Sequence, residues 1–285
     1  MRPQLLRAIY YVTVDHFVAI PQALTADLAY HGIKLYQVPY SSIEKFLPPK
    51  NLSPHSCLIL CDVPQLATAF LDADYYVVAV SHIDNKGQSF PRIEFVVEDF
   101  TEIDWFYFVK YWQRYAGIPW HVLDTERCRI REMSPEDIND LYDLYSDKRI
   151  CEYTEDLFED RMTELNYIND YVKHMYRFYG FGTWIIEDKM TGKMIGRAGF
   201  NYRPGFEDPE LGFVIKPSLW RHGYALEVCK AILEYGKNEF GFTRFNAFAR
   251  PENTASVCLL QRLGFRSCGR YTINKELHDR WILEK

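Results

Sequence analysis

The first 120 residues carry short, continuous apolar runs with a helical pattern between them. Cys57 to Cys61 and Tyr75 to Val80 are apolar or aromatic, and Pro64 to Asp72 has helical spacing. A third run follows at Arg92 to Val97. Because strands covered on both faces lose the alternation of polar and apolar residues, this pattern predicts a small parallel α/β sheet. A helix capped by Thr101 within a Thr-x-x-Asp motif closes this part.

From residue 125 onward the pattern changes to alternating strands with amphipathic helices between them. Ser134 is expected to cap the first helix. Two alternating apolar runs around Thr191 and Gly192 predict a hairpin, and a strand stopped by Pro217 follows. The next helix has an apolar face and a charged face. The apolar face is made by Ala225, Val228, Cys229, Ile232 and Leu233. The charged face is made by Glu227, Lys230, Glu234 and Lys237 at spacings of three and four residues.

The chain closes with a strand at Thr243 to Ala249, a short helix and a hairpin. Asn253 is the expected N-cap of that helix and Gly264 follows its last turn. The element order β-α-α-β-β-β-α-β-α-β-β predicts a mixed α/β sheet, antiparallel at first and then crossing over through one helix. We therefore expect two domains, an α/β domain at 1–120 and a second domain at 125–285.

Composition and charge exclude several classes of protein. Charged residues make up 25% of the chain and the net charge is −6, so there is no basic excess for nucleic acid. No apolar run approaches the length of a membrane span. The first apolar stretch is broken at Asp15 and has no cleavage site of a signal peptide. Seven cysteines without a CxxC, and no HExxH, predict a cytoplasmic protein without disulfides or a metal site.

The most informative stretch is the uncapped start of the amphipathic helix, Trp220-Arg221-His222-Gly223-Tyr224-Ala225. It offers no Ser, Thr, Asp or Asn to accept hydrogen bonds from the first N–H groups. An anion such as a phosphate would satisfy these groups and the helix dipole. A plain turn with water at the helix end is the alternative.

Three segments make 125–285 resemble the GNAT acetyltransferases, in particular the ribosomal-protein N-acetyltransferase-like branch. They are IGRAGF (195–200), ELGFVIKPSLWRHGYALEV (210–228) and NTASVCLLQRLGF (253–265). The resemblance implies a GNAT fold, with a mixed and splayed central sheet and flanking helices. It also implies acetyl-CoA as co-substrate and no metal.

The resemblance implies a role for the turn before the helix. In this family the coenzyme A pyrophosphate lies on the backbone N–H groups of such a turn. The matching residues here are Arg221, His222, Gly223, Tyr224 and Ala225. Trp220 stands where the family usually has Gln or Arg. This difference is tolerated because the pyrophosphate is bound by backbone N–H groups and not by that side chain.

The preceding strand and the last helix supply further cofactor contacts in this family. Phe213, Val214 and Ile215 match the strand that pairs with the pantetheine arm, and an N–H near Phe213 or Val214 would stabilise the oxyanion. Asn253 matches a pantetheine-contacting Asn, although a simple N-cap explains it equally well.

The acid and the base are expected from two further positions. Glu210 matches the carboxylate that acts as general base, through water, at the start of this strand. The Tyr that serves as general acid in many members is replaced by Leu260, so Ser256 becomes the candidate donor to the thiolate. An ordinary strand-end Glu and a packed Ser are the alternatives.

The acceptor is expected to be a primary amine, on a small molecule or a protein N-terminus, attacked directly in a ternary complex. Acidic residues border the expected cleft and would attract a cation, or simply form a solvated helix start: Glu152, Glu155, Asp156, Glu159 and Asp160. A catalytically weak acyl-CoA-binding regulatory protein is the alternative function. A homodimer is compatible with the sequence.

The N-terminal part faintly resembles half of a haloacid-dehalogenase-like phosphatase. LILCDVPQLATAFLDADYYVVAV (58–80) is similar to that family's strand-Asp-helix-strand segment, but the Asp-x-Asp nucleophile is missing. Asp62 would be either a relic of a magnesium ligand or a helix cap. We expect no phosphatase activity. The sequence of this domain does not indicate which role it has.

Overall fold

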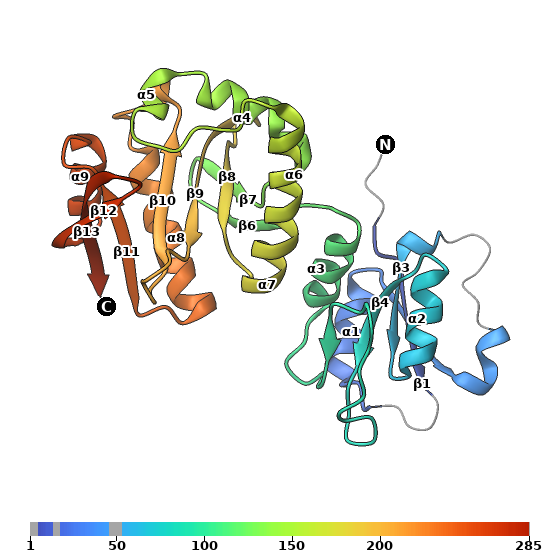
Figure 1. Cartoon of the computed structure of the whole chain (residues 1–285). Helices are drawn as coiled ribbons and strands as arrows, with labels where there is room; N and C mark the ends of the chain where they lie inside the picture. The colour runs from blue at the N-terminus through green and yellow to red at the C-terminus, as the bar shows by residue number, and fades with distance from the viewer. Residues whose placement is uncertain (1–4, 14–17, 46–52, 285) are drawn as a thin grey trace. The chain divides into compact units, whose positions relative to one another are not determined.

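The computed structural model describes residues 5–13, 18–45 and 53–284 of the chain, so Asp15 lies outside the described residues. The chain divides into two compact units, Met1–Ile118 and Pro119–Lys285. Figure 1 shows the N-terminal unit in blue to green and the C-terminal unit in green to red. No helix in the described ranges is both long and apolar enough to cross a membrane.

The N-terminal unit is built on a five-stranded parallel sheet in the order β2-β1-β3-β4-β5. Its strands are β1 (Ala8–Thr13), β2 (Lys34–Pro39), β3 (Cys57–Cys61), β4 (Tyr76–Val80) and β5 (Val96–Val97). Its helices are α1 (Gln22–Tyr30), α2 (Pro64–Asp72) and α3 (Trp105–Tyr115), with short 3₁₀ turns at η1 (Tyr40–Lys45) and η2 (Pro54–Ser56).

Both faces of this sheet are buried, as the continuous apolar runs predict. Ile9 and Leu58 belong to a cluster with residues of α1 and α3, whereas their neighbours Ala8 and Ile59 pack with α2 on the other face. The predicted parallel α/β sheet is therefore confirmed. The apolar strand β1, the helix α1 and the strand β2 were not predicted.

Two predicted helix caps of this unit are wrong. Helix α3 begins at Trp105, and the carboxylate of Asp104, not Thr101, accepts from the Tyr107 N–H at 2.9 Å. Asp62 does not cap α2, which begins at Pro64 without a side-chain cap. The Asp62 carboxylate instead accepts from the Thr13 hydroxyl and lies 3.3 Å from His82 Nε2. Its phosphatase-like role stays untested.

The C-terminal unit contains an eight-stranded sheet in the order β12-β13-β11-β10-β9-β8-β7-β6. Neighbouring strands are antiparallel, except that β10 and β11 run parallel. The strands are β6 (His121–Asp124), β7 (Cys128–Arg131), β8 (Thr183–Asp188), β9 (Met194–Asn201), β10 (Glu210–Ile215), β11 (Arg244–Ala249), β12 (Arg266–Ile273) and β13 (Glu276–Glu284).

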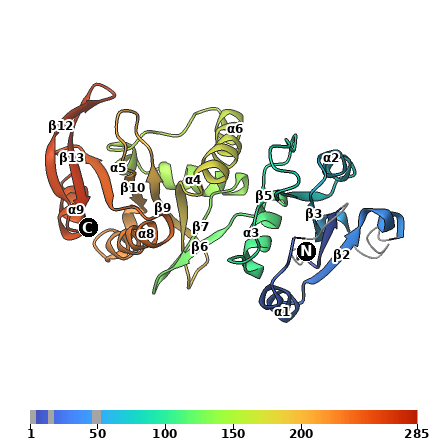
Figure 2. The same ribbon diagram turned by 90° about the horizontal axis from the view of Figure 1, so that it is seen from below.

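Helices cover both faces of this sheet (Figure 1, Figure 2). Phe200 of β9 packs against Gly236 of α8, and its neighbour Asn201 accepts a hydrogen bond from Tyr171 of α6 on the opposite face. The helical segments are η3 (Pro135–Asp137), α4 (Ile138–Tyr145), α5 (Lys148–Cys151), α6 (Arg161–Tyr171), the π-helical turn η4 (Val172–Tyr176), α7 (Arg177–Tyr179), η5 (Pro217–Leu219), α8 (Tyr224–Phe240) and α9 (Thr254–Arg262).

Most sequence predictions for this unit are confirmed. β8 and β9 form the hairpin around Thr191 and Gly192, Ser134 forms a capping box with Asp137, and Asn253 caps α9. Gly264 follows α9 with a φ of 90°. The mixed α/β fold class is likewise confirmed. Strand β6 and the short helix α5 were not predicted.

Candidate functional site

Strands β10 and β11 separate directly after their first residue pair. β10 is antiparallel to β9 in register from Glu210 to Ile215, whereas its only described partner in β11 is the pair Glu210–Asn246. Beyond that pair, one edge of β10 is free to pair with an extended ligand. Phe213 and Val214 are half-buried beside this opening, and Ile215 is buried.

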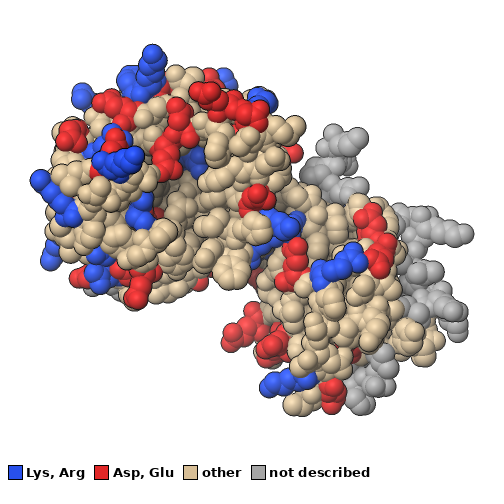
Figure 3. Space-filling model, viewed as in Figure 1, with Lys and Arg blue, Asp and Glu red and all other residues tan. Residues whose placement is uncertain are grey.

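Gly212 widens the opening on one face of the sheet. A Cβ atom built on it meets no atom within 4 Å, although its register partner Gly199 is tightly enclosed by Gly182 and Thr183. Side chains alternate between the two faces of a strand, so Gly212 shares a face with Glu210 and Val214. Figure 3 shows the front of the C-terminal unit hollowed near its centre, with basic and acidic side chains at the rim.

The turn that leads from β10 into α8 has the backbone of an anion-binding site. Arg221 and Gly223 have φ values of 64° and 86°, and His222 between them has a negative φ. Such alternation directs successive N–H groups into one concavity. Helix α8 begins at Tyr224 with no side chain capping it. Arg221, His222 and Gly223 are exposed and Ala225 is half-buried, so a ligand has access to the turn.

Arg127 holds this turn from the side and was not predicted from the sequence. Its Nη1 donates to the His222 carbonyl at 3.0 Å, and its guanidinium lies 4.1 Å from the centre of the Tyr224 ring. The carboxylate of Glu227, in the first turn of α8, binds Arg127 Nε at 2.7 Å and the Arg127 N–H at 2.8 Å. The Thr125 hydroxyl donates to the same carboxylate at 2.6 Å.

Burial acts to raise the pKa of Glu227, but the hydrogen bonds from Thr125 and Arg127 outweigh it and lower the pKa. Glu227 is only 18% exposed. Glu227 therefore does more than line the charged face of α8: it fixes the start of the helix to the segment before β7. No spacing rule reveals this contact, because its partners are about a hundred residues away in the chain.

Trp220 makes a structural contact within the turn. Its indole Nε1 donates to the Ile215 carbonyl at 2.7 Å, which ties the turn to the end of β10. His222 Nδ1 lies 2.9 Å from the Trp220 carbonyl, and the Tyr224 hydroxyl donates to Asp188 at 3.3 Å. The turn is thus held by side-chain contacts and by the His222 N–H, which donates to the Leu219 carbonyl at 3.4 Å.

Glu210 lies at the point where the two strands part, but its carboxylate is engaged. Arg203 Nε and Nη2 bind its two oxygens at 2.5 and 2.9 Å, and the Glu210 side chain is 14% exposed. Opposite it, the buried Asn246 accepts from Arg280 at 2.8 Å and donates to the Asp208 carbonyl at 3.0 Å. This bidentate ion pair occupies one lone pair on each carboxylate oxygen and leaves one on each free to accept a further hydrogen bond.

Asn253 and Ser256 lie together at the start of α9. The Asn253 carbonyl oxygen accepts from the Ser256 backbone N–H at 3.1 Å, as its N-cap role predicts. Ser256 is half-buried, whereas Leu260 is buried in the core. Cys258 is exposed on the same helix. No described contact joins Ser256 to Glu210.

The acidic residues expected around the acceptor cleft divide into two groups. Asp160 is the N-cap of α6, where it accepts from the Thr163 N–H at 2.8 Å, and Glu155 accepts from Asn274 at 2.7 Å. Glu152 and Glu159 are both exposed, and the Asp156 carboxylate accepts from the Leu157 N–H at 3.0 Å. The helix-start interpretation is thus correct for Asp160.

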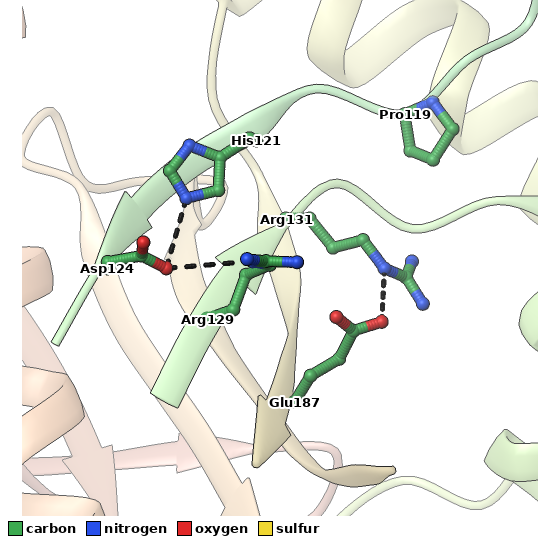
Figure 4. A pocket seen from close by; sticks show the side chains of 6 residues that line it. All are labelled: Pro119, His121, Asp124, Arg129, Arg131 and Glu187. Atoms are coloured by element: carbon green, nitrogen blue, oxygen red, sulfur yellow. Dashed lines mark hydrogen bonds and ion pairs between the residues drawn. The ribbon is translucent and has the colours of Figure 1, made fainter. Parts of the chain in front are cut away.

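A separate hollow lies at the far edge of the sheet, on β6 to β8. Figure 4 shows its six lining side chains, which are Pro119, His121, Asp124, Arg129, Arg131 and Glu187. Its charges neutralise one another: His121 lies 3.1 Å from Asp124, and Arg131 lies 2.6 Å from Glu187. It shares no residue with the β10–α8 site. Among the described residues, no group of three His, Cys, Asp or Glu side chains is arranged to hold a metal ion.

Comparison with known proteins agrees with this geometry. The model of the acetyltransferase (GNAT) domain matches residues 127–266. The uncharacterized protein YkkB of Bacillus subtilis is 32% identical over 145 residues, which are 50% of this chain and 83% of that protein. The uncharacterized N-acetyltransferase YoaA of the same species is 27% identical, over 52% of this chain and 84% of that protein.

A solved structure shares the fold of the same region. A putative GNAT-family acetyltransferase from Bordetella pertussis superposes with a TM-score of 0.51 and 23% identity, over 57% of this chain and 99% of that one. The matched region contains both the splayed strand β10 and the uncapped start of α8. The chain therefore belongs to the GNAT acetyltransferase family, through its C-terminal unit.

Proposed function

We propose that the C-terminal unit transfers an acetyl group from acetyl-CoA to a primary amine by direct attack in a ternary complex. The observation that supports this best is the continuity between two features of one segment. The edge of β10 opens beyond Glu210, and the same chain then forms the anion-binding turn at the start of α8. Together they suit a ligand with an extended arm and a phosphate end, which is the chemistry of coenzyme A.

In this proposal the backbone from Arg221 to Ala225 binds the pyrophosphate, and Arg127 holds the turn in shape. The free edge at Phe213, Val214 and Ile215 binds the pantetheine arm, together with Asn253. A backbone N–H near Phe213 or Val214 donates to the oxyanion that develops when the amine attacks the thioester carbonyl. These groups need no rearrangement, because the strand and helix already fix them.

Glu210 is proposed as the general base, acting through a water molecule, and Ser256 as the proton donor to the departing thiolate. The pairing of Glu210 with Arg203 modifies this proposal. Arg203 occupies one lone pair on each oxygen, so the proton is accepted at a remaining lone pair of the carboxylate. Direct transfer without an acyl-enzyme is proposed because Cys229, the described cysteine of the β10–α8 segment, is fully buried; Cys258 is exposed on α9 and is not given a catalytic role.

The Arg203–Glu210 ion pair also favours a second candidate, an acyl-CoA-binding protein without turnover. Thiol release from acetyl-CoA over a panel of primary amines distinguishes the two. An acetyltransferase releases free coenzyme A only when an amine is present, in an amount equal to the acetylated product. Tight acetyl-CoA binding with no amine-dependent thiol release would support the second candidate.

A further inference from the structure

Arg197 is a half-buried guanidinium on the face of the sheet that borders the proposed transfer site. It lies in β9, in register with Val214 of β10 on one side and Ile185 of β8 on the other. Paired residues of neighbouring strands share a face, so Arg197 is on the same face as Gly212 and Glu210. Helix α6 covers this face, since Tyr171 donates to Asn201 at 2.9 Å.

Tyrosines surround this arginine. The groups that act on its charge are the phenols of Tyr145, Tyr167, Tyr171 and Tyr176. Burial acts to lower the pKa of Arg197, but the phenols outweigh it and the pKa is raised, so the guanidinium stays charged. Neither an ion pair nor a hydrogen bond joins it to any residue in the described ranges.

The acidic residues on this side have other partners. Glu210 binds Arg203, Glu155 accepts from Asn274, and Glu164 is buried and accepts from the Phe158 N–H at 3.0 Å. Other arginines of this unit, among them Arg127 and Arg131, each bind a carboxylate. A half-buried charge without a counter-ion is unfavourable unless a ligand supplies one.

Arg197 lies close to the proposed site of acetyl transfer. Neighbouring strands are about 4.8 Å apart, so Arg197 is adjacent to the backbone near Val214 that is proposed to hold the oxyanion. An amine that attacks there, and carries an anionic group a few bonds away, brings that group within reach of the guanidinium. The planar fork of an arginine matches a carboxylate in a bidentate contact.

We propose that Arg197 is a specificity-determining residue that binds the carboxylate of the acceptor, so that the favoured acceptors are amino acids rather than simple amines. This rests on the proposed function of the same site. The exposed acidic side chains near α6 suit the ammonium group of such an acceptor, and Arg197 suits its carboxylate. The acceptor is thereby recognised at both of its charges.

The test is calorimetric titration of the full-length protein, with coenzyme A present, by each of the twenty common L-amino acids and its carboxamide. Wild type is expected to bind at least one amino acid tenfold or more tightly than the carboxamide. Arg197→Met is expected to lose that preference, Arg197→Lys to weaken it, and the edge variant Arg129→Met to keep it. Arg129 is a fitting control because its side chain is 55% exposed and lies on β7, which is separated from β9 by β8.

The proposal is overturned if no amino acid is preferred over its carboxamide by wild type, or if the preference survives in Arg197→Met. Should Arg197→Met fail to fold, the wild-type comparison and Arg197→Lys decide the question. Because binding is the readout, failure of the acetyl transfer is seen separately. A carboxylate preference that depends on Arg197, without thiol release, supports this inference and contradicts the proposed function.

Discussion

Glu210 and Asn246 face one another at the point where β10 and β11 meet, and no later residue of β10 has a described partner in β11. Both side chains are fixed, Glu210 by Arg203 and Asn246 by Arg280 and the Asp208 carbonyl. The opening of the sheet is therefore held at its closed end by two arginines.

Glu210→Gln is expected to lower kcat by about 10²- to 10⁴-fold, the usual contribution of a general base. The KM for acetyl-CoA should change little, because no proposed cofactor contact is lost. Steady-state kinetics at saturating acetyl-CoA measure this. Glu187→Gln, which breaks an equivalent arginine pair at the sheet edge, is the control. A Glu210→Gln enzyme with more than a tenth of the wild-type kcat would show that another group accepts the proton.

Glu227→Gln is expected to destabilise the C-terminal unit by about 1.5 to 3 kcal/mol near pH 6, because hydrogen bonds to a charged group are lost. The pKa of Glu227 is lowered in the folded protein, so its charge contributes stability above the unfolded value of about 4.3. That contribution is lost as the pH falls through the folded pKa.

Urea unfolding of wild type and Glu227→Gln between pH 6 and pH 3 checks this dependence. The difference in unfolding free energy should shrink toward zero as the solution becomes more acidic. The exposed Glu234→Gln, on the same helix, should show no comparable difference. A difference that stays constant over the whole range would mean that the charge of Glu227 is unimportant.

Gly199 of β9 and Gly212 of β10 are paired in register, but only Gly212 is expected to tolerate substitution by alanine. A Cβ atom on Gly199 would lie 1.9 Å from the Gly182 carbonyl oxygen, so Gly199→Ala has to force β8 and β9 apart. A loss of about 3 kcal/mol or more is expected, at the upper end of overpacking effects. Gly212→Ala should cost less than about 1 kcal/mol, since its Cβ has open space, yet it should reduce activity by narrowing the opening.

Thermal unfolding and thiol release on the two variants separate stability from activity. Equal destabilisation by both substitutions would contradict the open space beside Gly212. An unchanged activity in a well-folded Gly212→Ala protein would place the reacting groups elsewhere.

The sequence predicts local features of this site better than its long-range contacts. The uncapped start of α8 and the N-cap Asn253 are visible because each depends on a few consecutive residues. The anchoring of Glu227 by Arg127 is not, because helical spacing places Glu227 beside Lys230 on a charged face. Likewise, nothing in the segment around Glu210 indicates that Arg203 neutralises it.

In the N-terminal unit, the helix caps likewise cannot be predicted from the local sequence alone. Thr101 and Asp104 both suit the start of α3, and only the observed bond to the Tyr107 N–H selects Asp104. Asp62 looks like a helix cap from its position after β3, but its burial beside Thr13 and His82 depends on the pairing of β1 with β3. Such pairing joins segments some fifty residues apart, beyond what local spacing indicates.

The central claim is that the start of α8 binds the phosphates of acetyl-CoA. Gly223→Glu places a side chain and a negative charge in the turn, whereas Gly241→Glu makes the same change at the other end of the same helix. Both glycines have a left-handed backbone, with φ values of 86° and 66°, and both are exposed, so their conformational costs are matched.

Calorimetric titration of acetyl-CoA into wild type and these two variants is the most direct measurement. We expect micromolar binding by wild type and by Gly241→Glu, and at least a hundredfold weaker binding by Gly223→Glu. Equal binding by Gly223→Glu and Gly241→Glu, or no binding by wild type, would contradict the phosphate-binding role of this turn.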